Sequence, residues 1–312
     1  MSQNKSRIFR DEFEALGTKI VLHVVVKSEQ EFGKARIDAK KVRELYEYFT
    51  KIFSRFDKES ELSKLNNDLG KFQKVSPEML RLAEKILKHH KETLGFFEPR
   101  ILETMENIGY SQDFSKGIKM IGNLNNENFA ELAEDLKVEN EKIYFGRRMD
   151  FSGIAKGFIN DEIVIFLREK GWKNFLVDSG GDMYASGVDE NGEKWTVDVE
   201  GINYGNLMFA LSDLAIATSG IGKRKWEIEG KRFHHIINPK KSLDFSFELK
   251  SVSVIADSTT KADVWAKTLF LMGREDGIIY AGEHNLKAVF LAYRGGAWIS
   301  PKVKELLYKK HE

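Results

Sequence analysis

The amino-acid sequence predicts an α+β protein with mixed, mostly antiparallel sheets and packed helices. Three stretches, at residues 42–56, 79–87 and 262–270, carry apolar side chains at the spacing that forms one buried helix face. Short apolar or alternating runs bounded by turn residues predict the strands. Because several strands follow one another without an intervening helix, we expect hairpins together with pairings between distant strands.

The first half of the chain predicts a strand followed by two helices. Residues 13–26 form an apolar run with a break near its start, which we interpret as the strand. The first helix has a buried stripe made of Val42, Leu45, Tyr46, Phe49, Phe53 and Phe56. The second helix opens at Ser76-Pro77, an N-cap followed by proline at the first helical position, and ends at Gly95. We expect His89 and His90 in its solvated last turn, where the helix dipole favours positive charge.

The second half of the chain predicts two further helices among strands. The first of these helices ends at Gly171, and the turn 179–182 follows the next strand. Other strands are expected at residues 195–199, 214–220, 251–256, 288–293 and 297–300, with a hairpin inside 225–239. Asp150 and Asp182 stand beside glycine turns, where an aspartate either meets a ligand or bonds its own backbone. Both readings stay open at these two positions.

We expect a single domain over residues 1–312, since a hydrophobic content of 42% allows a large common core. Residues 111–147 are polar and rich in asparagine around one amphipathic piece. They predict a peripheral elaboration of that domain.

The composition excludes several classes of function. Lys and Arg number 49 against 48 Asp and Glu, and no basic block is present, so nucleic acid is not an expected partner. Without cysteine the chain has no disulfide, thiolate metal site or cysteine nucleophile. No apolar run reaches the roughly 20 residues of a membrane span, and the first residues do not form a secretory signal. We therefore expect a cytoplasmic protein, or a periplasmic or surface-anchored one if an export signal has been removed.

A glycine-punctuated segment before the helix that ends at Gly171 is the strongest signal for a binding site. Ser152 is expected to cap this helix, and Gly153 and Gly157 leave room for a backbone or ligand to come close. Unpaired amides at the helix start, together with Lys156, predict a cradle for phosphate oxygens. The same glycines also fit an ordinary connection to the next strand, so the segment alone leaves both interpretations open.

Two further pairs of polar residues are candidates for chemistry. Asp263 and Lys267 stand four residues apart beside the buried stripe of their helix, so both can face whatever lies at its N-terminal end. His234 and His235 are neighbours in a strand, where alternation sends them to opposite faces. We expect one of the two histidines in solvent. The alternative for Asp263 and Lys267 is a surface ion pair, and the alternative for the histidines is a purely structural role.

Taken together, these segments resemble the ApbE family of flavin transferases, which attach FMN from FAD to a Ser or Thr of a target protein. The motifs that match occur in order from residue 13 to 273 and beyond. They are FEALGT, FSRFDKESELSKLN, GFFEP, DFSGIAKGF, VDSGGDMYASG, ATSG, KRFHHIINP and SVSVIADSTTKADVWAKTLFLMG. The resemblance implies a T-fold-related architecture and an FAD:protein FMN transferase that releases AMP. It also implies FAD as substrate, Mg²⁺ on its diphosphate and an acceptor protein as partner.

The resemblance assigns roles to individual positions. Those expected to contact FAD are Leu16, Phe56, Phe96, Phe97, Glu98, Asp150, Lys156, Asp182 and Ile237. His235 falls at the position of the base that activates the acceptor hydroxyl. The carbonyl of Gly153 and the carboxylate of Asp263 fall at ligand positions of the Mg²⁺ ion, which places Asp263 among the catalytic residues. A cation there would neutralise charge on the AMP leaving group.

Three positions depart from the family pattern. Lys267 stands where the family has a metal-ligating Thr, while Thr268 lies one residue later on another side of the helix. A charged lysine is a poor metal ligand, and its ammonium can take the place of the metal against the diphosphate. Asn238 replaces the Asp of the family's His-Ile-Ile-Asp-Pro, and Glu98 replaces a shorter Asp.

These departures keep two alternatives to the transferase open. One is a non-catalytic FAD-binding protein, and the other is an FAD pyrophosphatase that gives FMN and AMP. A dinucleotide-binding protein of the Rossmann type is not favoured, because GIAKG and SGGD do not form its glycine fingerprint.

Overall fold

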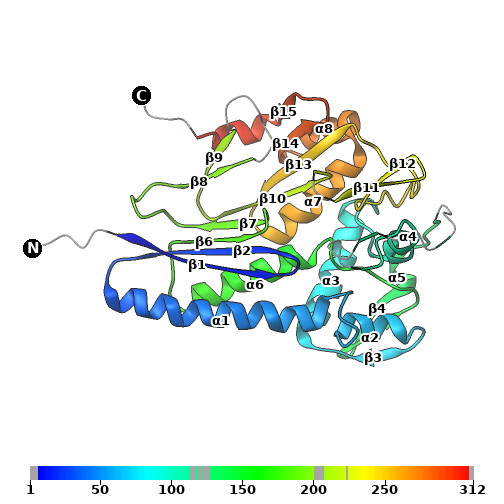
Figure 1. Cartoon of the computed structure of the whole chain (residues 1–312), viewed down its shortest axis with the longest axis horizontal. Helices are drawn as coiled ribbons and strands as arrows, with labels where there is room; N and C mark the ends of the chain where they lie inside the picture. Colours follow the sequence, from blue (N-terminus) through cyan, green and yellow to red (C-terminus); the bar gives the residue numbers. More distant parts are fainter. Residues whose placement is uncertain are drawn as a thin grey trace, which may run out of the picture.

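The computed structural model describes residues 6–112, 117–118, 122, 127–199, 207–222 and 224–308. An eight-stranded sheet runs through it in the order β1-β2-β6-β7-β10-β13-β14-β15, and each neighbouring pair is antiparallel (Figure 1). Its strands are β1 (Arg7–Ala15), β2 (Thr18–Val26), β6 (Phe175–Ser179), β7 (Met183–Ser186), β10 (Leu214–Gly220), β13 (Leu249–Ala256), β14 (Lys287–Ala292) and β15 (Ala297–Ile299). The α+β class with mostly antiparallel strands is confirmed.

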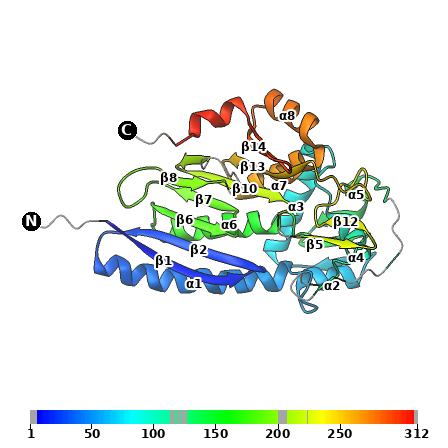
Figure 2. The ribbon, with the colours of Figure 1, turned by 45° about the horizontal axis from the view of Figure 1, so that its top comes forward.

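Helices and three small sheets surround the large sheet. The helices are α1 (Glu29–Phe53), α2 (Glu61–Asn67), α3 (Pro77–Glu92), α4 (Leu102–Asn107), α5 (Leu132–Asp135), α6 (Ala155–Glu169), α7 (Thr259–Met272) and α8 (Arg274–Glu283), with 3₁₀ turns η1 (Pro99–Ile101) and η3 (Pro301–Leu306). The small sheets are β3 (Phe72–Lys74) with β5 (Lys142–Phe145) and β4 (Leu136–Glu139), β8 (Trp195–Asp198) with β9 (Met208–Leu211), and β11 (Lys225–Ile228) with β12 (Lys231–His234). In Figure 2 the β4–β5 and β11–β12 hairpins lie at the end of the molecule away from both termini.

Alternate side chains of the large sheet enter cores on its two faces. On β2, Ile20, Leu22 and Val24 pack on the face covered by α1 and α6, whereas Val25 packs on the other face. The helical layer continues with α7 beneath β13, where Val252 is buried, and with α8 beneath β14. The second face is covered by β8, β9 and η3. In this arrangement α6 and α7 lie side by side under the middle of the sheet.

Residues 13–26, predicted as one strand, contain the end of β1, a turn and the whole of β2 in a hairpin. β1 and β2 pair from Arg7 opposite Val26 to Ala15 opposite Thr18. Leu16 and Gly17 form the turn with φ of 54° and 66°, the left-handed values that a two-residue hairpin turn requires. The expectation of one strand with a break is therefore wrong, because the break reverses the chain.

The two predicted helices of the first half are α1 and α3. In α1 the stripe residues Val42, Tyr46, Phe49 and Phe53 are buried as expected, but Phe56 lies beyond the helix end and is 41% exposed. The hydroxyl of Ser76 accepts from the amide of Met79, so the predicted cap of α3 is confirmed. His89 is buried and His90 contacts Glu98, so their expected exposure to solvent is wrong.

Part of the segment 111–147 belongs to the main core. Its α5, β4 and β5 contribute Leu132, Leu136, Ile143 and Phe145, which are at most 2% exposed in the same cluster as α1 and α6. A peripheral position is therefore wrong for this part, and most of residues 113–126 lie outside the described residues. The single domain over the whole chain stays a prediction. Within the described ranges no helix combines the length and the apolar character that crossing a membrane requires.

Candidate active site

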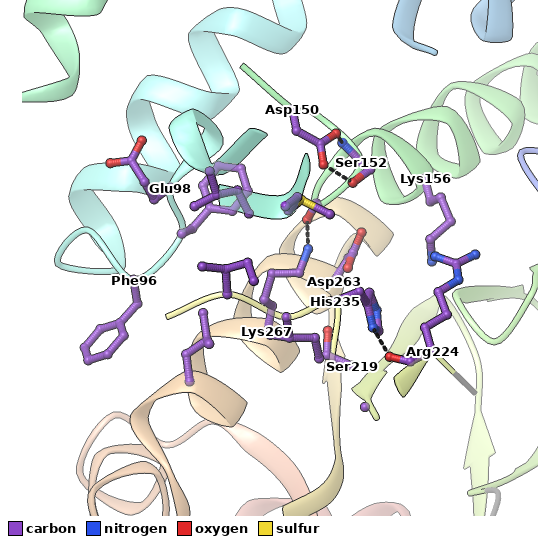
Figure 3. A pocket seen from close by; sticks show the side chains of 18 of the residues that line it. Phe96, Glu98, Asp150, Ser152, Lys156, Ser219, Arg224, His235, Asp263 and Lys267 are labelled. Atoms are coloured by element: carbon purple, nitrogen blue, oxygen red, sulfur yellow. Dashed lines mark hydrogen bonds between the residues drawn. The ribbon is translucent and has the colours of Figure 1, made fainter. Parts of the chain in front are cut away.

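A pocket lies where the ends of β10 and β12 meet the N-terminal part of α6, the helix α7 and the loop after α3 (Figure 3). The positions predicted from the sequence that line it are Phe96, Phe97, Glu98, Asp150, Gly153, Lys156, His235, Ile237, Asp263 and Lys267. The fold therefore gathers most of the predicted site from four distant parts of the chain. Figure 3 shows Phe96 on one side of the pocket and Lys156 with Arg224 on the other, with Asp263, His235 and Lys267 between them.

Three predicted contacts do not line this pocket. Leu16 lies in the β1–β2 turn and packs against the main core. Phe56 has its ring 6.0 Å from that of Tyr110, and Tyr110 itself lines the pocket. Asp182 is buried behind Lys156 and pairs with its ammonium. Contact of these three residues with a flavin stays a prediction.

Asp150 organises the turn that leads into α6. Its carboxylate accepts from the amide of Ser152 over 2.8 Å and from the Ser152 hydroxyl over 2.7 Å. Because this hydroxyl is used there, α6 begins without a side-chain cap at Ile154, and the predicted capping role of Ser152 is wrong. The buried guanidinium of Arg55 lies behind the turn, with its Nε 3.6 Å from Asp150 Oδ2.

Protein groups already occupy several amides at the start of α6. The amides of Ile154 and Ala155 donate to the carbonyl of Phe151 over 3.0 and 2.8 Å. The amide of Gly157 faces the Asp263 carboxylate and acts to lower its pKa. The predicted phosphate cradle of helix amides is therefore not built from the amides of Ile154 and Ala155. Positive charge in the pocket comes instead from the side chains on its walls, above all from Lys156.

Gly157 lets α6 and α7 approach closely. A Cβ at this position would lie 2.8 Å from the Thr259 carbonyl oxygen and 2.8 Å from the Thr260 Cα, both of them backbone atoms of α7. Asp161, one turn further along α6, accepts from the amides of Thr259 and Thr260 over 2.7 and 3.0 Å. It therefore satisfies two free donors at the start of α7. These contacts fix Asp263 of α7 against the first turn of α6.

We expect Gly157→Ala to destabilise the protein by about 1–3 kcal/mol, because two helix backbones must move apart to admit the methyl group. Urea unfolding measures this change. The control is Gly33→Ala in α1, where a Cβ meets nothing within 4 Å. That variant should gain about 0.4–1 kcal/mol from lower entropy of the unfolded chain. Equal stability of the two variants would contradict the close contact of α6 with α7.

Lys156 is held as a cation between carboxylates. Burial alone would lower the pKa of Lys156, but the charges of Asp182 and Asp263 outweigh it and raise that pKa above its ordinary value. Asp182 is fixed in turn by Asn160, whose Nδ2 donates to the Asp182 carbonyl over 2.8 Å and to Ser179 Oγ over 3.2 Å. The turn 179–182 predicted from glycines therefore anchors the partner of Lys156.

Asp263 and Lys267 both point into the pocket, as their spacing predicts. Burial raises the pKa of Asp263 to about 6, and the negative charge of Asp182 adds to this effect. The Oδ2 atom of Asp263 is buried without a hydrogen-bond partner in the described part of the chain. Lys267 Nζ donates to the Gly153 carbonyl over 2.7 Å, and burial lowers the pKa of Lys267. The pocket thus holds a partly unsatisfied carboxylate beside an ammonium.

His235 follows β12 and presents one ring nitrogen to the pocket. Its amide and its Nδ1 lie 3.3 and 3.2 Å from the carbonyl oxygen of Arg224. Because a carbonyl only accepts hydrogen bonds, Nδ1 carries the ring proton and Nε2 keeps a free lone pair. Burial, with the charge of Arg224, lowers the pKa of His235 to about 3, so the ring is neutral near pH 7. This tautomer can accept a proton at Nε2.

His234 occupies the opposite face of its strand, as predicted. Its ring packs edge-on against Phe245, Phe247 and Phe270, and its Nε2 lies 3.1 Å from the Ser246 carbonyl. Burial lowers the pKa of His234 to about 4. His234 is buried and His235 is half-buried, so the expectation that one of the pair lies in solvent is wrong.

The sequence profile of the ApbE family matches residues 16–290. The chain belongs to the ApbE family. Similar proteins include the FAD:protein FMN transferase of Haemophilus influenzae, 27% identical over 265 residues, which are 77% of this chain and 74% of that protein. The Klebsiella pneumoniae protein of the same name is 29% identical over 167 residues, 51% of this chain. In that comparison the chain spans 47%, about half, of the relative's length.

Solved ApbE structures share the fold over nearly the whole chain. The apo flavinyl transferase ApbE of Pseudomonas stutzeri superposes with a TM-score of 0.84 at 18% identity, covering 98% of this chain and 99% of that one. The flavin transferase ApbE of Vibrio cholerae gives 0.81 at 21% identity, covering 97% and 100%. The ApbE-like architecture expected from the motifs is thereby confirmed.

Glu98, a departure from the family pattern, is tied into the protein by both carboxylate oxygens. Arg100 donates to Oε1 through Nε and to Oε2 through Nη2, each over 2.8 Å, and His90 Nε2 lies 3.2 Å from Oε2. Burial alone would raise the pKa of Glu98, but Arg100 and His90 hold it below its ordinary value. The longer side chain of this ApbE protein thus reaches Arg100, and its contact with a flavin stays a prediction.

Asn238, another departure from the ApbE pattern, connects the loop after β12 to α7. Its Nδ2 donates to the carbonyl of Leu271 over 3.3 Å, while its Oδ1 accepts from the amide of Lys240 over 3.0 Å. A carboxylate could not make the first of these bonds, because it has no hydrogen to donate. The amide therefore has a structural use beside the adjacent pocket residue Ile237.

Sequence reasoning missed several residues of the pocket wall. Thr218, Ser219 and Gly220 belong to the ATSG motif, which carried the resemblance but no assigned role. Arg224 lies between two strands in a segment without periodicity, and nothing in its neighbours pointed to the carbonyl that orients His235. Tyr110 follows α4, just before the segment expected to be peripheral, and no role was assigned to it. The ATSG motif could have revealed Thr218, Ser219 and Gly220, but the sequence holds no such signal for the other residues.

Proposed function

We propose that this protein is an FAD:protein FMN transferase, which moves FMN from FAD to a Ser or Thr hydroxyl of an acceptor protein and releases AMP. The observation that carries the proposal is the free Nε2 of His235, which faces a pocket whose cations suit a diphosphate. Membership of the ApbE family and the names of the similar proteins support the same activity. The cytoplasmic location expected from the sequence stays a prediction.

The two sides of the pocket suit the two chemical parts of FAD. The apolar and aromatic lining of the pocket comes from Phe96, Phe97, Ile101, Met105 and Tyr110, and Figure 3 shows Phe96 at one side. The other side carries Lys156 and Arg224, with Lys267 between the sides. A planar ring gains from contact with aromatic side chains, whereas phosphate oxygens gain from charged donors. The residues present therefore fit a flavin nucleotide.

The transfer exchanges one phosphorus–oxygen bond for another. His235 Nε2 takes the proton of the acceptor hydroxyl, whose oxygen attacks the phosphorus on the riboflavin side of the diphosphate. The bond from that phosphorus to the bridging oxygen breaks, and AMP leaves with the electron pair. Lys156, Lys267 and Arg224 offset the negative charge that moves onto AMP. A general base of this kind contributes about 10²–10⁴-fold to the rate.

The products of one incubation test the proposal against its alternatives. The purified protein is mixed with FAD and an acceptor protein of an ApbE family enzyme, and both proteins are weighed by mass spectrometry. An FMN increment on the acceptor is the expected result. Free FMN and AMP without that increment would identify a pyrophosphatase. Unchanged FAD would identify a non-catalytic FAD-binding protein. This alternative is favoured by the hydrogen bond of Lys267 to the carbonyl of Gly153, which is a metal ligand in the family pattern.

We also expect the protein to bind FAD more tightly than FMN, because the cations of the pocket meet both phosphates only in FAD. Each additional charge-assisted hydrogen bond is worth about 1.5–3 kcal/mol, which corresponds to about tenfold or more in affinity. Calorimetric titrations with FAD, FMN, AMP and riboflavin measure how much each part of FAD contributes to the binding free energy. Equal or tighter binding of FMN would count against this placement of the diphosphate.

A further inference from the structure

Lys267 carries the departure from the ApbE family that bears most directly on the chemistry. It lies one helical turn after Asp263 on α7, and its side chain lines the same pocket. Its Nζ donates to the Gly153 carbonyl over 2.7 Å (Figure 3). A Cβ at residue 153 would collide with this Nζ, so the absence of a side chain makes the space that the ammonium fills.

The oxygens around this ammonium do not fit a Mg²⁺ ion. Mg²⁺ requires about six oxygen ligands in octahedral order at about 2.0–2.1 Å. The Gly153 carbonyl, one of the ligands expected from the family, already accepts a hydrogen bond from Lys267 Nζ. Thr268 donates to the Val264 carbonyl over 2.8 Å inside the helix layer, so its hydroxyl does not replace the missing ligand. Of the three family positions only Asp263 offers an unused oxygen.

The described residues give no substitute for these ligands. Nowhere in the described ranges do three or more His, Asp or Glu side chains form a group that could hold a metal ion. A divalent cation beside the Gly153 carbonyl would also meet the positive charge of Lys267 at close range. Both observations oppose a metal at this point of the pocket.

We propose that the ammonium of Lys267 replaces the divalent cation, so that the pocket binds the diphosphate of FAD without a metal. This inference rests on the proposed function, since it takes FAD as the substrate. An ammonium has three N–H donors. One is used on Gly153, which leaves two for phosphate oxygens and for Asp263 Oδ2, the buried acceptor without a partner in the described chain.

Metal dependence of FAD binding tests the inference. FAD is titrated into the native protein in EDTA and in Mg²⁺, followed by quenching of its fluorescence, and bound Mn²⁺ is counted by electron paramagnetic resonance. We expect the two dissociation constants to agree within about twofold, and no Mn²⁺ to bind with FAD. An affinity at least about tenfold higher in Mg²⁺, with Mn²⁺ bound, would overturn the inference.

Two variants separate the charge of Lys267 from its position. Lys267→Thr should weaken FAD binding in EDTA by about 10–100-fold, because it removes a charge-assisted hydrogen bond. In Mg²⁺ this variant should regain affinity for FAD, and with Mn²⁺ it should bind the metal ion. Lys267→Met should show the same loss in EDTA without any gain in Mg²⁺. Native affinity of Lys267→Met in EDTA would overturn the inference. The matched control is Lys261→Thr, which removes an exposed lysine of the same helix that pairs with Asp257; it should bind FAD like the native protein.

Failure of this inference is distinct from failure of the proposed function. If FAD binds without metal but no FMN reaches the acceptor, the transferase proposal fails and the inference stands. If FAD does not bind, inorganic pyrophosphate is titrated under the same two conditions. Pyrophosphate binding that is equal in EDTA and Mg²⁺ and lost in Lys267→Met supports the inference, whereas binding that requires Mg²⁺ overturns it.

Discussion

His235→Ala should lower FMN transfer by about 10²–10⁴-fold while leaving the affinity for FAD within about twofold of native. The reason is the tautomer fixed by Arg224, which leaves Nε2 as a free base facing the pocket. This base acts on the acceptor hydroxyl and not on FAD. Single-turnover transfer measured by mass spectrometry gives the rate, and titration of FAD by fluorescence gives its dissociation constant.

Imidazole in solution should restore part of the transfer activity to His235→Ala, because a small base can enter the space left by the ring. A purely structural role of His235 would not respond to imidazole. The matched control is His284→Ala, which removes an exposed histidine stacked on Tyr280 at the end of α8. Its transfer rate should be native. A parallel loss of rate and FAD affinity in His235→Ala would assign His235 to FAD binding instead.

His234→Ala requires a separate expectation, because this ring fills a buried space among three phenylalanines. From the sequence, the opposite strand face predicts a neutral substitution. In the structure the substitution leaves a cavity and frees the carbonyl of Ser246, so protein stability should fall. Transfer per folded molecule is then the quantity to compare with His235→Ala.

Local signals in the sequence were sufficient for the four longest described helices, α1, α3, α6 and α7, and for most strands of the large sheet. Ser76-Pro77 fixes the start of α3, and Gly171 and Gly273, both with φ of 85°, follow the ends of α6 and α7. These features depend on neighbours in sequence, which is why they could be predicted. The hairpin partner β1 was missed because it is an edge strand whose exposed side chains are mostly charged, so its alternation lacks the apolar contrast of β2.

Burial of individual polar residues could not be predicted in the same way. His234 is enclosed by Phe245 and Phe247 from the following loop, and His90 meets Glu98 only because the chain reverses after α3. The orientation of His235 depends on a carbonyl eleven residues earlier, at Arg224. Such contacts arise from the tertiary arrangement, and local sequence patterns do not predict them.

Lys267 shows what sequence and structure each contribute to the site. The motif spacing placed Lys267 at a family metal-ligand position, and its chemistry predicted an ammonium in place of the metal. The hydrogen bond to Gly153 specifies which ligand the ammonium takes over. By contrast, Ser152 matched the composition of a helix cap but bonds Asp150, because a nearer carboxylate competes for its hydroxyl.

Arg100→Met should destabilise the protein by about 3–5 kcal/mol, because it leaves the buried carboxylate of Glu98 without its guanidinium partner. The Arg100 side chain is 0% exposed and binds Glu98 through two hydrogen bonds of 2.8 Å. It also donates to Asp135 over 2.6 Å and to the Ala130 carbonyl over 2.7 Å. Urea unfolding at neutral pH measures the loss. The control is Arg81→Met, which removes an exposed pair with Glu162 and should cost at most about 1 kcal/mol.

The loss in Arg100→Met should shrink as the pH falls. In the native protein the pKa of Glu98 lies below its ordinary value. The ionised Glu98 therefore stabilises the fold at pH values above its pKa in the unfolded chain, and this stabilisation is lost as the pH falls through its pKa in the folded protein. Without Arg100, burial becomes the dominant effect and raises the pKa of Glu98, so acid relieves the buried charge by protonating it. Glu98→Gln added to Arg100→Met should recover part of the loss at neutral pH for the same reason. A loss that is independent of pH and unchanged in the double variant would show that Arg100 stabilises the fold by packing on Phe129, 5.0 Å from its guanidinium, and not by its charge.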